Sequence, residues 1–201
     1  MSRPYRYTNS RPSHTHAYLL PTVERHLERT RAKTVFDLGC GNGSAANQLA
    51  SQYQVSGIDA SSEGIREANR AFPKLKLAIG SAYDDLAQEY GTFDAVISLE
   101  VVEHLYDPRR WASTLFSLVR PGGVAVVSTP YHGYLKNLAL AVTGNMDRHF
   151  TALWDGGHIK FWSIDTLSTL LHEAGFQNLQ VDRVGRIPQL AKSMIFCGQK
   201  S

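Results

Sequence analysis

Cysteine is scarce in this sequence. Only Cys40 and Cys197 occur, far apart in the chain, and such a pair does not make the disulfide framework of a small secreted domain. The sequence therefore predicts a fold without disulfide bonds in a reducing compartment. Cys40 has no obvious base beside it, so we interpret it as a small residue that fills a tight space.

Extended apolar runs and a strong excess of one kind of charge are also lacking. No apolar stretch approaches the ~20 residues that cross a bilayer, and the first residues lack the apolar core of a secretory signal. The net charge of +3 is modest and not concentrated, which makes a nucleic-acid partner an unfavoured interpretation. We therefore expect a cytoplasmic protein without a membrane span that acts on a small molecule. Its oligomeric state is not indicated.

The composition is that of one globular domain. Hydrophobic residues make up 43% and charged residues 19% of the 201 positions, which are ordinary values for a folded domain with a real core. We expect a single domain over 1–201, with an N-terminal arm and helix over 1–33. The stretch from Arg3 to Pro12 is basic and aromatic. It could be a nucleic-acid arm, but a loosely docked terminus is the favoured interpretation.

Strand and helix patterns alternate along the chain. Strands are expected at 34–38, 54–59, 75–79, 93–99, 124–128, 179–183 and 194–197. Helices are expected after Ser13 or Thr15, at 44–51, after Ser61 or Ser62, before the fourth strand, from Pro108, and from Ser163 to Gly175. This alternation predicts a parallel sheet with crossover helices, an α/β fold in which ligands bind at the carboxyl ends of the strands.

One segment breaks this rhythm. Residues 131–162 contain no clear strand and are too long for a simple connection. Because the segment follows the end of a strand, we expect it to form a cap over the cleft. Leu138 to Val142 could rest on a membrane surface, but a short helix packed on the cleft is the favoured interpretation.

The most informative segment joins the first strand to its helix. Gly39, Gly41 and Gly43 stand at alternate positions after Asp37. Such glycines let the backbone turn sharply and expose amide N–H groups at a helix N-terminus, which is typical of a nucleotide site. The spacing is G-x-G-x-G, with Ser44 where the nicotinamide fingerprint has its third glycine. Asp37 would repel a pyrophosphate and suits an α-amino group or a sulfonium.

A second acid ends the second strand. Asp59 follows Gly57 and Ile58, and a carboxylate in this place can accept both ribose hydroxyls. Two acids and three glycines without a pyrophosphate clamp indicate S-adenosylmethionine as the ligand.

The chain here resembles the class I S-adenosylmethionine-dependent methyltransferases. The resemblance runs from Thr34 to Pro130 and includes the glycine loop, Asp59, the segment from Phe93 to Ile97, and Pro121-Gly122-Gly123. It implies a Rossmann-like, doubly wound, mostly parallel seven-stranded sheet with an antiparallel C-terminal strand and a helical cap insertion.

The same resemblance assigns cofactor roles to individual residues. It implies that Gly39, Gly41 and Gly43 wrap the methionine part, that Asp37 lies near the amino group and that Asp59 holds the ribose. It further implies that Ser81 and Ala82 lie beside the adenine and that Leu99 lines the cofactor cleft.

Acids and a histidine follow the fourth strand in the segment Glu100-Val101-Val102-Glu103-His104. Glu100, Glu103 and His104 can crowd the place where the methyl group leaves, and His158 from the cap can join them. Two interpretations stay open. Carboxylates and imidazoles suit a divalent ion such as Mg²⁺ held by all four side chains. Alternatively, Glu103 caps the following helix while the histidines face the substrate.

The segment resembles two branches of the fold. One is the ubiquinone-biosynthesis O-methyltransferases, and the other is the small-RNA 3′-terminal 2′-O-methyltransferases, whose metal site matches the same four residues. The chain departs from both. Tyr131 and His132 stand where asparagine is frequent, no arginine follows shortly after, and 201 residues leave no room for a nucleic-acid-binding domain.

The sequence thus predicts a methyltransferase that acts on a small-molecule hydroxyl. His104, His158 or, less favoured, His132 would take the acceptor's proton, with Glu103 beside them. The alternatives are a methyltransferase of RNA ends or of protein, and a module that binds S-adenosylmethionine without transferring its methyl group.

Overall fold

A computed structural model describes residue 7 and residues 9–201. Seven strands form one sheet in the order β3-β2-β1-β4-β5-β7-β6. The strands β1 to β5 run parallel, and β7 is antiparallel to both of its neighbours. The strand order reverses between β1 and β4, so the ligand cleft is expected at their carboxyl ends. The predicted mostly parallel sheet with an antiparallel C-terminal strand is confirmed.

The strands are β1 (Thr34–Leu38), β2 (Gln54–Asp59), β3 (Lys76–Ile79), β4 (Phe93–Leu99), β5 (Val119–Pro130), β6 (Gln177–Val184) and β7 (Ser193–Gln199). The α-helices are α1 (His16–Arg29), α2 (Ser44–Leu49), α3 (Ser62–Ala71), α4 (Leu86–Tyr90), α5 (Pro108–Leu118), α6 (Tyr134–Val142), α7 (Met146–Phe150) and α8 (Ile164–Glu173). Two short 3-10 helices complete the described elements, η1 (Val102–His104) and η2 (Pro188–Leu190).

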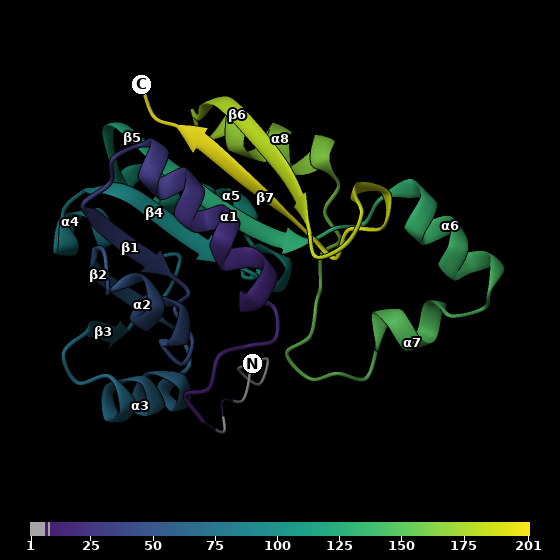
Figure 1. Cartoon of the computed structure of the whole chain (residues 1–201), viewed down its shortest axis with the longest axis horizontal. Helices are drawn as coiled ribbons and strands as arrows, with labels where there is room; N and C mark the ends of the chain where they lie inside the picture. The colour runs from purple at the N-terminus through teal and green to yellow at the C-terminus, as the bar shows by residue number, and fades with distance from the viewer. Residues whose placement is uncertain (1–6, 8) are drawn as a thin grey trace.

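Helices cover both faces of the sheet (Figure 1). On one face α1 packs Leu19, Val23 and Leu27 against β1, β4, β5 and β7. On the other face α5 and α8 bury a larger cluster that includes Trp111 and Leu167. Side chains of the central strands alternate between these two clusters because successive residues of a strand point to opposite faces.

Local sequence signals account for the helix ends. The Ser61 side chain accepts a hydrogen bond from Gly64 N at the start of α3, and Ser163 forms a capping box with Thr166 at the start of α8. Each bond satisfies a backbone N–H that has no partner inside its helix. At α1 the position of the expected cap is right, but Thr15 makes no side-chain cap bond.

The fifth strand begins earlier than the sequence predicts. The expected turn at Pro121-Gly122-Gly123 lies inside β5, where the register with β4 shifts and Gly122 has φ +77°. Gly122 N donates to Lys200 O, and Lys200 N donates to Gly123 O. These bonds continue the pairing of β5 to Lys200, the residue after β7. The glycines therefore form an irregularity within β5 and do not precede the strand as a separate turn.

The segment between β5 and α8 forms α6 and α7, which project from the carboxyl ends of the strands (Figure 1). Neither helix contains a fully buried residue, and Leu135, Leu138 and Val142 are 54%, 46% and 79% exposed. The apolar face formed by these three side chains is therefore not packed against the rest of the domain, whereas Lys136, Ala139 and Leu140 of α6 line the cavity. Within the described residues, no helix has the length and apolarity to cross a membrane.

Candidate active site

The glycine loop leaves β1 at the point where the strand order reverses. Gly39, Gly41 and Gly43 all have positive φ, at +97°, +54° and +74°, a region that side chains with a Cβ rarely adopt. At Gly39 there is also no space, because an added Cβ would lie 2.5 Å from Val101 Cγ2. The loop therefore keeps its backbone open toward the ligand at the N-terminus of α2.

Two acids flank this loop as the sequence predicts. Asp59 accepts hydrogen bonds from Gly41 N at 2.8 Å and from Ser61 N at 2.7 Å. Asp37 is buried, and its Oδ2 has no hydrogen-bond partner among the described residues. Burial, and then the Asp59 carboxylate, raise the pKa of Asp37 to about 8. A buried carboxylate oxygen without a partner is costly, so this site is suited to a ligand with a cationic or hydrogen-bond-donating group.

A cavity of about 1510 Å³ opens beside the loop. Its lining includes Asp37, Gly39, Gly41, Asp59 and Leu99. The cavity therefore joins the carboxyl ends of β1, β2 and β4, where the expected cofactor residues gather.

Three of the expected cofactor residues do not line the cavity. Gly43 is packed beneath the loop against Leu77 and Ala68. Ser81 and Ala82 lie outside the lining because Ser81 N donates to the Asp84 carboxylate in a turn and Ala82 packs against the core. Their contact with the adenine stays a prediction.

The N-terminal segment closes one side of this cavity, which the sequence did not indicate. Asn42 Nδ2 donates to Asn9 O at 2.8 Å and to Arg11 O at 3.0 Å. Asn9, Arg11 and Tyr7 all line the cavity, and the Tyr7 ring lies against Gly41 and Gly64. This segment is therefore held at the glycine loop, in contrast to the expected loose terminus. Residues Arg3 to Arg6 of the predicted arm lie outside the described residues.

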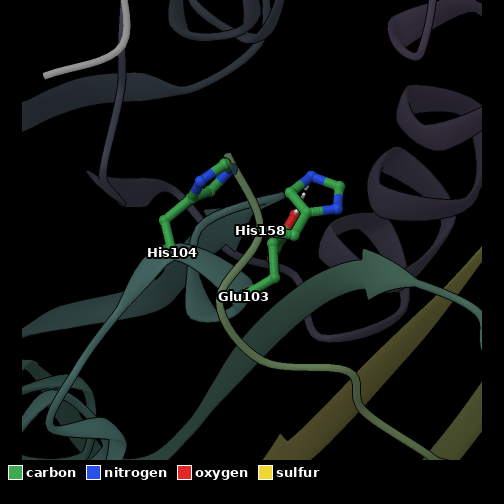
Figure 2. Close-up of side chains that lie close together, drawn as sticks. All are labelled: Glu103, His104 and His158. Atoms are coloured by element: carbon green, nitrogen blue, oxygen red, sulfur yellow. Dashed lines mark ion pairs between the residues drawn. The ribbon is translucent and has the colours of Figure 1, made fainter. Parts of the chain in front are cut away.

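An acid–histidine group stands at the other end of the cavity. Ligand atoms of Glu103, His104 and His158 lie within 4.8 Å of one another, and all three residues line the cavity. In Figure 2 the Glu103 carboxylate points toward His158, with Oε1 3.9 Å from His158 Nε2. The imidazole rings of the two histidines are 4.9 Å apart.

Backbone hydrogen bonds bring these residues together from distant parts of the chain. Glu103 O accepts from Ile159 N at 2.9 Å and from Lys160 N at 3.1 Å, which fixes the segment after His158 on η1. His104 Nδ1 lies 3.0 Å from Gly156 O and 3.2 Å from Gly157 O. A carbonyl can only accept, so Nδ1 carries the proton and Nε2 keeps the lone pair.

Burial changes the protonation of the whole group. It lowers the pKa of His104 and lowers that of His158 to about 4. It raises the pKa of Glu103 well above its ordinary value, and the Glu100 charge adds to this effect. The imidazoles are therefore neutral at pH 7.

Glu100 lies apart from the other three residues. Its carboxylate accepts from Ser128 Oγ at 2.9 Å and from Ser193 Oγ at 3.4 Å, and the residue has φ +56°. Burial raises its pKa to about 7. The expected four-residue group thus contains three members in this structure, because the backbone at Glu100 turns the side chain toward β5 and β7.

His132 does not line the cavity. Its ring contacts those of Phe150 and Phe161 at centroid distances of 5.9 and 5.0 Å. Burial lowers its pKa to about 4. These contacts join the end of β5 to α7 and to the segment before α8. The role of His132 as a base stays a prediction, with less support than that of His104 and His158, which line the cavity.

Comparisons with known proteins agree with this geometry. A family model described as a methyltransferase domain matches residues 7–181. The ubiquinone biosynthesis O-methyltransferase of Burkholderia pseudomallei (strain 1710b) is 31% identical over 169 residues, which cover 80% of this chain and 71% of that protein. The protein of the same name from Caulobacter vibrioides is 38% identical over 116 residues, 55% of this chain and 46% of that protein. The chain spans about half the length of several curated relatives that it matches.

Among solved structures, the methyltransferase domain of bacterial CtHen1 superposes with a TM-score of 0.68 at 23% identity. The superposition covers 90% of this chain and 96% of that one. At this identity the likeness concerns the fold alone.

Proposed function

This chain belongs to the S-adenosylmethionine-dependent methyltransferases, and we propose that it methylates a hydroxyl group of a small-molecule acceptor. The observation that carries the proposal is a single cavity with two chemically different ends. One end holds the glycine loop with Asp37 and Asp59, and the other holds Glu103, His104 and His158. A donor and an acceptor can therefore meet inside one cavity.

The donor end supports binding of S-adenosylmethionine. The unpartnered Oδ2 of Asp37 offers an acceptor to a cationic group, and Gly39 and Gly41 of the loop line the same cavity. The bound donor supplies a methyl group that is already activated by its sulfonium. The protein then has to orient the acceptor for in-line attack, and correct placement alone can contribute ~7–11 kcal/mol to lowering the barrier.

The acceptor end supports removal of the hydroxyl proton. His104 Nε2 and the neutral His158 imidazole are both candidates for the base. Glu103 beside them can stabilise the imidazolium that forms. Oxygen acceptors fit this group because a hydroxyl must lose its proton during transfer.

The role of the two histidines is tested by the His104→Ala, His158→Ala double variant. We expect product formation from 3,4-dihydroxybenzoate or catechol to slow by about 100-fold or more, the usual contribution of a general base. Methylated product is measured by mass spectrometry, with His172→Gln on α8 as a control outside the cavity. Unchanged turnover in the double variant would contradict the assignment.

The same three side chains also fit a divalent ion, which we propose as the alternative to a histidine base, because a ring nitrogen that binds an ion cannot also take the proton of the acceptor. Glu103 Oε1 is buried and has no hydrogen-bond partner among the described residues, and His104 Nε2 keeps its lone pair. Carboxylate and imidazole together suit first-row divalent metals. An ion held by Glu103, His104 and His158 would lower the pKa of the acceptor hydroxyl.

Metal analysis of the purified protein tests this proposal. We expect close to one divalent ion per chain after dialysis against Mg²⁺, Mn²⁺ or Zn²⁺, and loss of that ion in Glu103→Gln. Glu63→Gln on α3 is the matched control, because Glu63 is exposed and does not line the cavity. Unchanged turnover in EDTA, by protein without a bound ion, would contradict the proposed metal site and leave the proposal of a histidine base standing.

Methylation of RNA ends or of protein is the main alternative, and a binding module without transfer is the second. Filter binding of RNA at two salt concentrations tests for an RNA substrate, since phosphate contacts would make binding depend steeply on salt. Tight S-adenosylhomocysteine binding without any methylated product would favour the binding module.

A further inference from the structure

Three cationic side chains line the cavity. They are Lys136 from α6, Arg186 from the loop after β6, and Lys192 before β7. Lys136 is half-buried, and its Nζ donates to Tyr131 O at 3.0 Å. An ammonium carries three N–H donors, so this one hydrogen bond leaves donors for a ligand.

No carboxylate pairs directly with these charges. Across residues 7 and 9–201, none of the three cations lies within 4.0 Å of an acidic side chain in an ion pair. The Glu100 carboxylate is bound by Ser128 and Ser193 instead. Lys192 Nζ lies over the Tyr18 ring at 5.4 Å, which is a contact with a neutral group.

Hydrogen bonds around the end of β5 place Lys136 near the acceptor residues. Lys136 Nζ donates to Tyr131 O, and Thr129, two positions earlier, donates to Glu103 Oε2 at 3.0 Å. The charge of Lys136 also contributes to lowering the pKa of His132, His149 and His158, after burial as the main cause. Burial and then the Arg186 charge lower the pKa of Lys136 itself, and the Glu100 charge opposes them.

We infer that the acceptor carries an anionic oxygen group, a carboxylate or a phosphate, which binds Lys136 with Arg186 beside it. This inference rests on the proposed function and narrows its substrate class. A half-buried cation is costly when nothing pairs with it. An anion on the acceptor would remove that cost and fix which hydroxyl faces His104 and His158.

Lys136 and Arg186 would play different parts. Lysine is a compact charge on a flexible stem, whereas arginine presents a planar fork that matches two oxygens. Arg186 is exposed at the cavity rim, so it can meet an entering anion, and the half-buried Lys136 can hold it inside.

Calorimetry of acceptor binding tests the inference independently of methyl transfer. The protein is saturated with S-adenosylhomocysteine and titrated with 3,4-dihydroxybenzoate or with catechol, which differ by one carboxylate. We expect the acid to bind at least about tenfold more tightly. In Lys136→Met the ratio of the two dissociation constants should fall toward one, whereas the exposed Lys74→Met retains it.

Additional measurements identify the kind of anion and guard against misfolding. Benzoate and phenyl phosphate, used as competitors, distinguish a carboxylate site from a phosphate site. If circular dichroism shows that Lys136→Met does not fold, Lys136→Gln replaces it. The ratio of the two dissociation constants is also measured for the wild-type protein at low and high salt, where an anion site predicts that the preference for the acid weakens at high salt. Equal binding of acid and catechol, or binding of neither, overturns the inference. So does an equal loss of S-adenosylhomocysteine affinity in Lys136→Met, which would assign the charge to the cofactor.

The proposed function can fail separately. Selective binding of the acid without any methylated product would contradict methyl transfer to a small hydroxyl and leave the anion site standing. Product formation from both compounds without preference would support methyl transfer to a small hydroxyl and contradict the anion site.

Discussion

At the level of single residues, Asp37 holds an unusual position for an acid. Its carboxylate is 2% exposed, with one oxygen lacking a partner among the described residues. Before a ligand binds, the raised pKa keeps Asp37 largely protonated at neutral pH. A cationic ligand favours the ionised form, so binding and deprotonation are linked.

This linkage predicts a pH dependence of cofactor binding. Affinity for S-adenosylmethionine should rise between pH 6 and pH 8, by up to about tenfold per pH unit, and level off above the pKa of about 8. Asp37→Asn should bind weakly and lose this dependence, while the exposed Asp165→Asn keeps it. Calorimetry across this pH range provides the measurement, and a flat wild-type profile would count against the role of Asp37.

The free energy of unfolding changes with pH in the opposite direction to cofactor affinity, because folding favours the protonated form of Asp37. The folded-state pKa of Asp37 lies above its ordinary value, so the folded protein holds this proton more tightly than the unfolded chain does. The contribution to the free energy of unfolding is complete below about pH 4 and is lost as pH rises toward 8.

At the level of elements, the glycine loop and the N-terminal segment act together. Asn42 links them, since its Oδ1 accepts from Ser44 Oγ at 2.8 Å while its Nδ2 donates to Asn9 O and Arg11 O. One side chain thus both orders the start of α2 and holds a wall of the cofactor cavity.

Asn42→Asp separates these two functions, because it keeps the acceptor for Ser44 and loses the donor. Two hydrogen bonds are removed, each worth about 1 kcal/mol net. We expect faster hydrogen exchange over residues 9–15 and a several-fold faster release of S-adenosylhomocysteine, with the exposed Asn69→Asp as control. Unchanged exchange and release would show that the segment does not retain the cofactor.

Across the domain as a whole, β7 joins the two hydrophobic layers. Phe196 belongs to the larger cluster on one face, and the adjacent Ile195 belongs to the cluster under α1. The strand pairs with β5 on one side and β6 on the other. Because both faces and both edges of β7 are covered, its residues contribute to the packing of the entire domain.

Phe196→Ala should therefore lower the free energy of unfolding by about 3–5 kcal/mol, the usual cost of truncating a buried phenylalanine. Its register partner Val181 on β6 is 37% exposed, and Val181→Ala should cost under about 1 kcal/mol. Urea titrations followed by circular dichroism measure both. Similar losses in the two variants would mean that β7 is not a central strand in solution.

Short-range patterns in the chain were enough to specify several features of this domain. The bounds of β1, β2 and β4 and the caps of α3 and α8 follow from local hydrophobicity and side-chain capping. Asp37 and Asp59 could be placed because parallel strands bring their carboxyl ends to one edge. His158 could be associated with Glu103 and His104 through its place in the expected cap, although it lies 54 positions after His104 in the chain.

Which side chains face the cavity became clear only from the folded chain. The positive φ at Glu100 turns its carboxylate toward Ser128 and Ser193, and ring contacts hold His132 outside the cavity lining. Lys136 and Arg186 meet although 50 positions separate them, because α6 and the loop after β6 converge on one cavity. Backbone turns and contacts between distant segments set these directions, and no local pattern of residues encodes them.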